Sequence, residues 1–407
     1  QFIIFMMLVK NRIDLSLTIL VNFIITIFFI CINPFYVLAL SSIINVFSNR
    51  INPNLFTFLF SLSFSLLFFN KFPGASGDGF YYLLRYIENF GFIERGSPVS
   101  NEPLWTIYEI LTSFILRGHE DLFILLTYFL LFLLVVILSR VINKEKFIII
   151  SFCLLLFNLQ LLYGVYQIWR TYFAILLFFV GAYSIRASLL IYLTPLIHVM
   201  TLPFVIIISK INYKYFLLFT LIAISLLPYI LDKFNDYQGS SISSQGLNLN
   251  FVIFAYLIGI VKILKLIKFS HIENRIFYVF LFLIFLPLFI DLTDAFHILY
   301  SRSFSLFLLF TSIIVARVVI SHQLFSYGFI FIYSIYRFMF SFNDPRIIHS
   351  LGSIGDGNPM YTYNGIWFLL ENFNLNRYSD FIIQYSECIS GILIFNRCRD
   401  LWIHVIN

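Results

Sequence analysis

Residues 122–139, LFILLTYFLLFLLVVILS, form a continuous apolar run that contains no charged residue. About 20 apolar residues in an α-helix cross the hydrocarbon core of a bilayer, so this run predicts a membrane-spanning helix. Residues 276–290, IFYVFLFLIFLPLFI, have the same character. Neither run alternates apolar and polar residues as the strands of a membrane β-barrel do, and helices satisfy the backbone of such runs within lipid.

The composition extends this conclusion to the whole chain of 407 residues, of which 60% are hydrophobic and 11% charged. Soluble domains carry about 25% charged residues, so a soluble enzyme and a disordered chain are both excluded. At about 20 residues for each span, the hydrophobic content allows at most about twelve spans. The net charge of +6 does not indicate nucleic-acid binding, because Lys and Arg of polytopic membrane proteins gather in short cytoplasmic loops.

We therefore predict an all-α polytopic membrane protein with about 10–13 transmembrane helices, organised as one integral membrane domain over residues 1–407. Residues 104–116 are too short to span and are predicted to form an interfacial or re-entrant helix. The weakly apolar stretch 379–396, which contains Glu387, is interfacial or spanning. The spans are predicted at 13–32, 35–48, 55–69, 122–139, 147–163, 167–185, 187–209, 215–231, 251–268, 276–290, 303–321 and 324–341.

Basic residues predict the orientation of these helices, because loops rich in Lys and Arg face the cytoplasm. Three short loops have this character, and they contain Arg140, Lys144 and Lys146; Lys210 and Lys214; and Lys262, Lys265, Lys268 and Arg275. Segment 187–209, which contains Pro195 and Pro203, would then start and end on the inner face unless it forms a hairpin.

The opposite, outer face holds the large loops 70–103, 232–250 and 343–365 and the shorter segments 164–170 and 291–302. These segments concentrate carboxylates, guanidinium groups and aromatic side chains. Such a surface suits a sugar-like ligand that carries an anionic group. Solvated loops with an aromatic belt at the membrane interface are the alternative interpretation.

Two acidic residues of the outer loops are candidates for chemistry. Asp78 lies between two glycines before a helical stretch, where it is either the N-cap of that helix or a general base for a sugar hydroxyl. Glu102 precedes Pro103 at the start of the short helix 104–116, and a capping role explains that position as well.

Two arginines and a histidine complete the candidates. Arg170 and Arg302 each precede a long apolar helix at the outer face. Each guanidinium either extends to phospholipid headgroups or holds a pyrophosphate, for which its rigid fork of donors is suited. His198 lies within the apolar segment LTPLIHVMTLPF. It is either functional or donates a hydrogen bond to a carbonyl that Pro195 or Pro203 leaves without its helical donor.

Several common signatures are absent from the sequence. It contains no P-loop, GxGxxG, HExxH, GxSxG or Asp-x-Asp motif, and Cys31, Cys153, Cys388 and Cys398 do not have metal-ligand spacing. We therefore predict neither a cofactor nor a metal ion.

In their order along the chain, these residues resemble the EpsG-like, Wzy-type polysaccharide (O-antigen) polymerases of bacterial surface-polymer synthesis. The resemblance covers roughly residues 75–305. Three Arg-x10-Gly pairs, a spacing described for Wzy proteins, are a mild excess over chance. The resemblance rests on Asp78-x-x-Tyr81, Asn101-Glu102-Pro103, Arg170, His198 and Arg302, and the pairs are Arg85 with Gly96, Arg170 with Gly181 and Arg346 with Gly357.

The resemblance implies a GT-C-like helical fold with re-entrant or interfacial helices on its outer face, in the bacterial inner membrane. It implies metal-independent transfer of a growing glycan from undecaprenyl pyrophosphate to a lipid-linked oligosaccharide repeat unit on the outer side. Membrane lipids and a chain-length regulator are the implied partners. The implied catalytic residues are Asp78, His198 and Arg170, and the implied substrate-binding residues are Arg302, Arg85, Tyr81, Glu102 and Arg346.

Three alternative functions remain open at this point. An O-antigen ligase or another GT-C glycosyltransferase would move the same glycan to a different acceptor. A flippase for lipid-linked oligosaccharides would bind the same charged lipid, but transporters of this kind often show two related halves. We find no internal repeat in the sequence.

Overall fold

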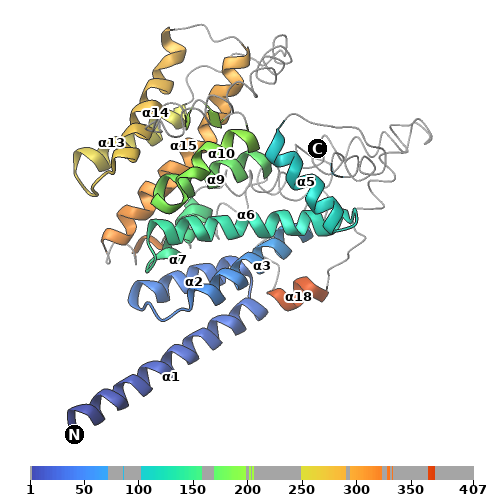
Figure 1. Cartoon of the computed structure of the whole chain (residues 1–407). Helices are drawn as coiled ribbons and strands as arrows, with labels where there is room; N and C mark the ends of the chain where they lie inside the picture. Colours follow the sequence, from blue (N-terminus) through green and yellow to red (C-terminus); the bar gives the residue numbers. More distant parts are fainter. Residues whose placement is uncertain are drawn as a thin grey trace. The chain divides into compact units, whose positions relative to one another are not determined.

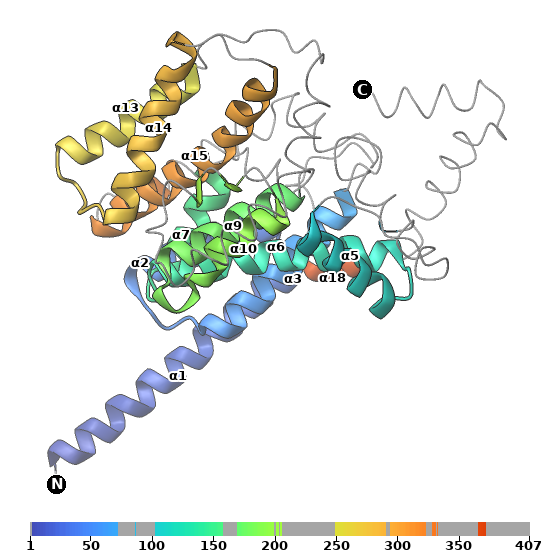
Figure 2. The same ribbon diagram turned by 45° about the horizontal axis from the view of Figure 1, so that its top comes forward.

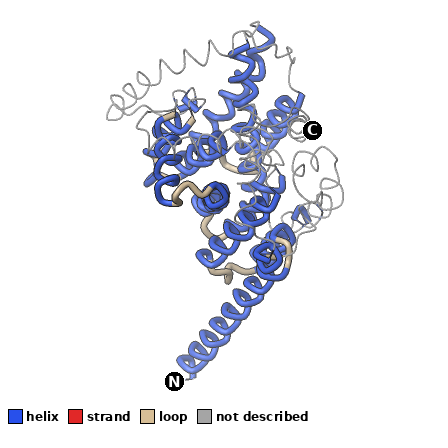
Figure 3. Tube along the Cα trace, turned by 90° about the vertical axis from the view of Figure 1, so that its right-hand side faces the viewer, coloured by secondary structure: helices blue, strands red, loops and turns tan. Residues whose placement is uncertain are grey.

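The computed structural model describes residues 2–71, 86, 102–157, 169–198, 201–202, 204–205, 249–289, 294–322, 328–330, 332 and 365–371. Every regular element in these ranges is a helix, and none is a strand (Figure 3). The all-α prediction is therefore confirmed for the described part of the chain. The predicted helices 215–231 and 379–396, and most of 324–341, lie outside it.

The contacts group the chain into two compact units, each discontinuous in sequence. Unit 1 comprises residues 1–84, 119–152 and 323–407, and unit 2 comprises residues 85–118 and 153–322. The single membrane domain expected from the sequence stays a prediction. Each unit is described below by itself.

Unit 1 contains six described helices, in which α3 and α6 lie side by side (Figure 1). Their bounds are α1 (Phe2–Cys31), α2 (Pro34–Phe47), α3 (Pro53–Lys71), α6 (Glu120–Ile142), α7 (Phe147–Phe152) and α18 (Ile366–Glu371).

Unit 2 contains six described α-helices and two short irregular helices. In it, α9 and α10 form a hairpin through residues 184–188, and α13 and α14 form another (Figure 2). Their bounds are α5 (Pro103–Ile115), the π-helical turn η1 (Cys153–Phe157), α9 (Trp169–Tyr183), the 3-10 turn η2 (Ile185–Ala187), α10 (Leu189–Ile197), α13 (Leu249–Ile263), α14 (His271–Phe289) and α15 (Asp294–Ser321).

A ladder of phenylalanines forms the core of unit 1. Phe56, Phe60, Phe64 and Phe68 recur every four residues along α3, so they lie on one face of that helix, and all four are fully buried. Phe132 of α6 contacts this face, with ring centroids 5.2 Å from Phe64 and 4.9 Å from Phe68. Such edge-on and tilted ring pairs add to the gain from burial, which accounts for part of the high phenylalanine content.

Within the described part of the chain, four helices are long and apolar enough to cross a membrane: Asp14–Cys31, Pro53–Asn70, Glu120–Ile142 and Ser303–Ser321. The first of these exposes Leu15, Ile19 and Phe23, which are spaced four residues apart, to more than half of their surface. A contiguous exposed apolar face of this kind is suited to lipid and not to water. The chain is therefore a membrane protein, whereas the total of 10–13 spans stays a prediction.

The short helix α5 matches the predicted segment 104–116. Its polar face is buried, and apolar side chains lie on its exposed face. Glu109, Thr112 and Ser113 are buried, whereas Leu111 and Phe114 are 54% and 70% exposed. With 13 residues, α5 is about 20 Å long and too short to span a bilayer.

Three predicted helix C-termini were wrong, for local reasons. The predicted helix 251–268 stops at Ile263, where Lys265 adopts a left-handed conformation (φ 52°) and the amide of Leu266 bonds the carbonyl of Val261. The predicted helix 147–163 is regular only to Phe152 and continues as the π-helical turn η1. The predicted helix 187–209 is interrupted after Ile197, and Leu202, Phe204 and Val205 are again helical. The predicted start of α15 was also wrong, because the helix begins at Asp294 and contains Arg302, which was expected to precede it.

Candidate active site

Three helix ends of unit 2 meet at one buried carboxylate. Glu102 is the N-cap residue of α5, Arg170 is the second residue of α9, and His198 is the C-cap residue of α10. The side chains of Arg170 and His198 both contact the carboxylate of Glu102. Residues that are far apart in the sequence, each taken from a helix terminus, therefore form a single polar cluster.

The start of α5 is set by the Glu102-Pro103 dipeptide. Pro103 occupies the first helical position, where its missing N–H costs nothing, and it restricts Glu102 to an extended conformation (φ −133°, ψ 102°). The Glu102 side chain makes no capping hydrogen bond. The interpretation of this carboxylate as a helix cap is therefore wrong, because the carboxylate binds other helices.

Helix α10 contains Pro195 and ends two residues beyond it, at Ile197. A proline leaves the carbonyl four residues earlier without its helical donor, and the hydroxyl of Thr194 donates to that carbonyl, Ile191 O, at 2.8 Å. The chain becomes extended at His198 (φ −153°, ψ 113°), and the hydroxyl of Thr201 donates to the His198 carbonyl at 2.9 Å. The alternative role of His198, bonding to a carbonyl exposed by Pro195, is thus performed by Thr194.

The cluster has short contacts and is almost closed to solvent. Glu102 Oε2 lies 2.6 Å from Nη1 of Arg170, and Glu102 Oε1 lies 2.8 Å from Nδ1 of His198. The side chain of Glu102 is fully buried, that of His198 is 9% exposed and that of Arg170 is 17% exposed. Arg170 is thus the most exposed side chain of the three.

The contact with Glu102 determines the tautomer of His198. An ionised carboxylate only accepts hydrogen bonds, so Nδ1 of His198 must carry the proton that lies between them. In the neutral imidazole, Nε2 then bears the lone pair that accepts a proton, and this atom is buried in the structure, so a substrate hydroxyl reaches it only when the cluster opens. A carboxylate that orients a histidine in this way is the arrangement found in histidine general bases.

The backbone adds positive potential to the same place. Both α5 and α9 begin at the cluster, and the first N–H groups of a helix, together with its dipole, favour negative charge. One guanidinium and two helix N-termini lie beside a single carboxylate, and the C-terminus of α10 at His198 contributes the opposite potential. The cluster thus offers a cation and helix N–H groups to an anionic group, close to a potential proton acceptor.

The other predicted site residues are not brought to this cluster by the described part of the chain. Asp78, Tyr81, Arg85 and Arg346 lie outside the described residues. The backbone of Arg302 lies in α15, but its side chain is not described.

Sequence reasoning missed a second buried carboxylate in α5. Glu109 is fully buried and accepts a hydrogen bond from the indole of Trp105 at 2.6 Å. The ring of Trp105 in turn contacts Tyr108 and Phe173, with centroids 5.1 and 6.1 Å away. The signal was a lone carboxylate within a short apolar helix, which marks a functional hypothesis in a membrane protein.

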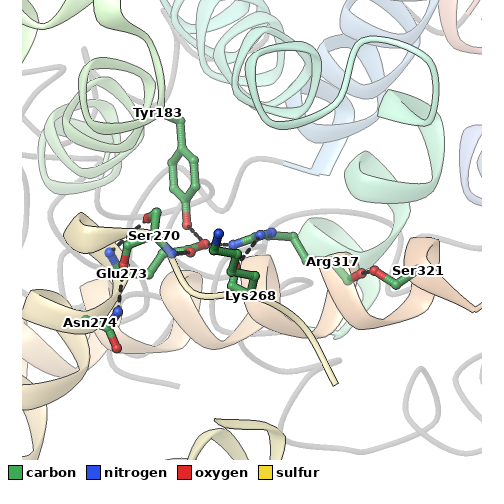
Figure 4. Close-up of polar contacts among 7 residues, drawn as sticks. All are labelled: Tyr183, Lys268, Ser270, Glu273, Asn274, Arg317 and Ser321. Atoms are coloured by element: carbon green, nitrogen blue, oxygen red, sulfur yellow. Dashed lines mark hydrogen bonds and ion pairs between the residues drawn. The ribbon is translucent and has the colours of Figure 1, made fainter. Parts of the chain in front are cut away.

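A second polar cluster ties the opposite end of α9 to α14 and α15 (Figure 4). The carboxylate of Glu273 accepts from the hydroxyl of Tyr183 at 2.8 Å and pairs with the guanidinium of Arg317. Glu273 and Ser270 also form a capping box, with reciprocal bonds of 2.6 and 3.2 Å between their side chains and amides. The described contacts of Glu273 thus join the end of α9 and the start of α14 to α15.

The helical rise places the two clusters far apart. Arg170 and Tyr183 lie at opposite ends of α9, about 20 Å from one another along its axis. The backbone of Arg302 is likewise about 22 Å along α15 from Arg317. Both predicted pyrophosphate-binding arginines therefore lie well away from the Glu273 cluster, which is adjacent to the lysine-rich segment 262–268.

Comparison of the chain with protein-family models, with curated proteins and with solved structures finds no match. In the ranges that the structure describes, no three His, Cys, Asp or Glu side chains group together as a metal site would require.

Proposed function

We propose that this chain is a Wzy-type polysaccharide polymerase with a GT-C-like fold in the bacterial inner membrane. It transfers a growing glycan from undecaprenyl pyrophosphate to a lipid-linked oligosaccharide repeat unit on the outer side. One observation carries the proposal: the buried Glu102 carboxylate joins the histidine Nδ1 and the arginine Nη1 at 2.8 and 2.6 Å. The contact supports the assignment of His198 as the base and of Arg170 as the cation for the leaving group.

His198 is the proposed general base. The acceptor hydroxyl of the new repeat unit donates its proton to Nε2 of His198, and Glu102 stabilises the imidazolium that forms. The hydroxyl oxygen then bonds to the anomeric carbon of the donor glycan. General bases of this kind contribute about 10²–10⁴-fold to rate. Asp78, which lies outside the described residues, stays the alternative candidate.

Arg170 is the proposed stabiliser of the leaving group. The bond that breaks joins the anomeric carbon to an oxygen of undecaprenyl pyrophosphate, and negative charge develops on that oxygen. The proposal assigns this charge to the partly exposed side chain of Arg170 and to the N-terminus of α9. The proposal assigns the second phosphate to Arg302 and requires no divalent metal.

A gel of surface polysaccharide from a strain that lacks this gene tests the proposed function. Loss of a polymerase leaves the lipid core capped with a single repeat unit, because export and ligation continue without chain growth. Loss of a ligase or of a flippase leaves the lipid core without any repeat unit. A ladder of normal length in the deleted strain would contradict all three functions.

A further inference from the structure

One narrow line of partly exposed side chains runs along α9 from Arg170. Between Trp169 and Gly181 every residue is buried except Arg170, Phe173 and Leu177. These three are spaced three and four residues apart, so they lie on one face of the helix, over about 10 Å. The line thus begins at a guanidinium and continues as two apolar side chains, and we call these three residues the α9 stripe.

The stripe ends where α10 packs against α9. A side chain at Gly181 would meet Ile191 of α10, whose nearest atom lies 2.8 Å from an added Cβ. Helix α10 therefore approaches α9 closely at Gly181, beyond Leu177. The accessible line is confined to the half of α9 that adjoins the Glu102 cluster.

An aromatic flank lies beside the stripe. Tyr108 of α5, which is also partly exposed, is stacked on Phe173 with centroids 6.2 Å apart and ring planes 29° apart. The buried Trp105 lies against both rings and is held by its hydrogen bond to Glu109. This arrangement gives the buried carboxylate of Glu109 a positioning role, because it fixes the indole that supports the two accessible rings.

We infer that the α9 stripe binds the apolar chain of a single-chain lipid phosphate of the polyprenyl class, with the phosphate at Arg170. The inference rests on the proposed function and adds the path of the lipid tail. Charge complementarity selects an anionic head, because Arg170 and the α9 N-terminus are positive. The stripe is one residue wide, with buried neighbours on each side. This width favours a lipid with one chain over a glycerophospholipid, which has two.

Photocrosslinking tests this path. Benzoyl-phenylalanine is placed at Phe173 or Leu177 of the purified full chain, and undecaprenyl monophosphate is added in micelles that contain phosphatidylglycerol. The matched control position is Phe282 of α14, which is 64% exposed. We expect the polyprenyl adduct at positions 173 and 177, and phosphatidylglycerol adducts at 282.

A second substitution separates a specific site from general lipid contact. Arg170→Ala should lower the polyprenyl adduct at position 173 at least about tenfold, the loss expected for one charge-assisted hydrogen bond. The matched control, Arg186→Ala, changes an exposed arginine beyond the other end of α9 and should leave the yield unchanged. Equal phosphatidylglycerol adducts at 173 and 282, or a polyprenyl adduct that persists in Arg170→Ala, would overturn the inference.

The inference and the proposed function fail separately. His198→Asn removes the proposed base but not the lipid path, so it should retain the polyprenyl adduct at full yield. An Arg170-dependent adduct together with normal polysaccharide in the deleted strain would reject the polymerase and keep the lipid site. A polymerase phenotype without any polyprenyl adduct at 173 or 177 would reject the lipid site alone.

Discussion

Glu102 Oε1 lies 2.8 Å from Nδ1 of His198, although 96 positions in the sequence separate the two residues. The carboxylate is fully buried, and its other oxygen contacts Arg170. A buried carboxylate is costly unless it is paired and hydrogen-bonded. The same contacts that offset this cost give His198 a defined tautomer, so structure and proposed chemistry depend on one side chain.

His198→Asn should abolish long polymer while the protein stays in the membrane at normal abundance. The Asn amide reaches the position of Nδ1 and still donates to Glu102, but it has no group equivalent to Nε2. We expect the rate of chain extension to fall about 10²–10⁴-fold, as measured with purified protein. Wild-type chain extension by this variant would remove His198 from the mechanism.

Arg170→Ala should lower the rate about 10²–10³-fold, because it removes a stabiliser of transition-state charge. Arg170→Lys should recover little activity, since Lys keeps the charge but loses the planar fork. Arg302→Ala should also abolish long polymer. The control is Arg186→Lys, at an exposed arginine, which should behave as wild type. Full-length polymer from Arg170→Lys would favour an arginine that only contacts headgroups.

Arg317→Met should destabilise the protein without a specific effect on catalysis. It removes the cation that pairs with the fully buried carboxylate of Glu273. Loss of one partner of such a pair costs about 3 kcal/mol, so we expect a lower unfolding midpoint in detergent and lower abundance. Ser321→Ala removes only the exposed hydroxyl that bonds the Arg317 carbonyl and should be neutral. An unchanged midpoint in Arg317→Met would contradict a structural role for this cluster.

Cysteine labelling tests the orientation of the chain in the membrane. In a background without the four native cysteines, cysteines at Ser97 and Ser353, both outside the described residues, should react with an impermeant maleimide in whole cells. A cysteine at Ser188, exposed in the turn between α9 and α10, should react only after the cells are opened. Protection of both outer positions, or labelling of Ser188 in intact cells, would overturn the predicted topology.

The sequence was sufficient to predict that helices form, because uncharged apolar runs such as 122–139 leave no other way to satisfy a backbone in lipid. It was not sufficient to predict where they end. Lys265 adopts a left-handed conformation that ends α13, and the π-helical turn begins at Cys153 within an unbroken apolar run. Neither position carries the Gly or Pro that usually marks such a change.

For the site, the sequence predicted the candidate residues but not which of them contact one another. Arg170 and His198 were recognised as polar groups at or within apolar segments, where ionisable residues are expensive. Glu102 had a sufficient local explanation as a helix cap, and its partners lie on helices α9 and α10. Contacts between distant helix ends depend on tertiary packing, which hydrophobic periodicity does not encode.

The rate of chain extension by purified Glu102→Gln, in buffer that contains EDTA, tests the central claim most directly. The matched control is Glu109→Gln, the same change at a fully buried carboxylate of the same helix, where the new amide oxygen still accepts from Trp105. We predict that wild type and Glu109→Gln extend lipid-linked repeat units without added metal, and that Glu102→Gln is slower by about 10² or more. Equal rates for the two variants, or a wild type that works only with added magnesium or manganese, would contradict the account.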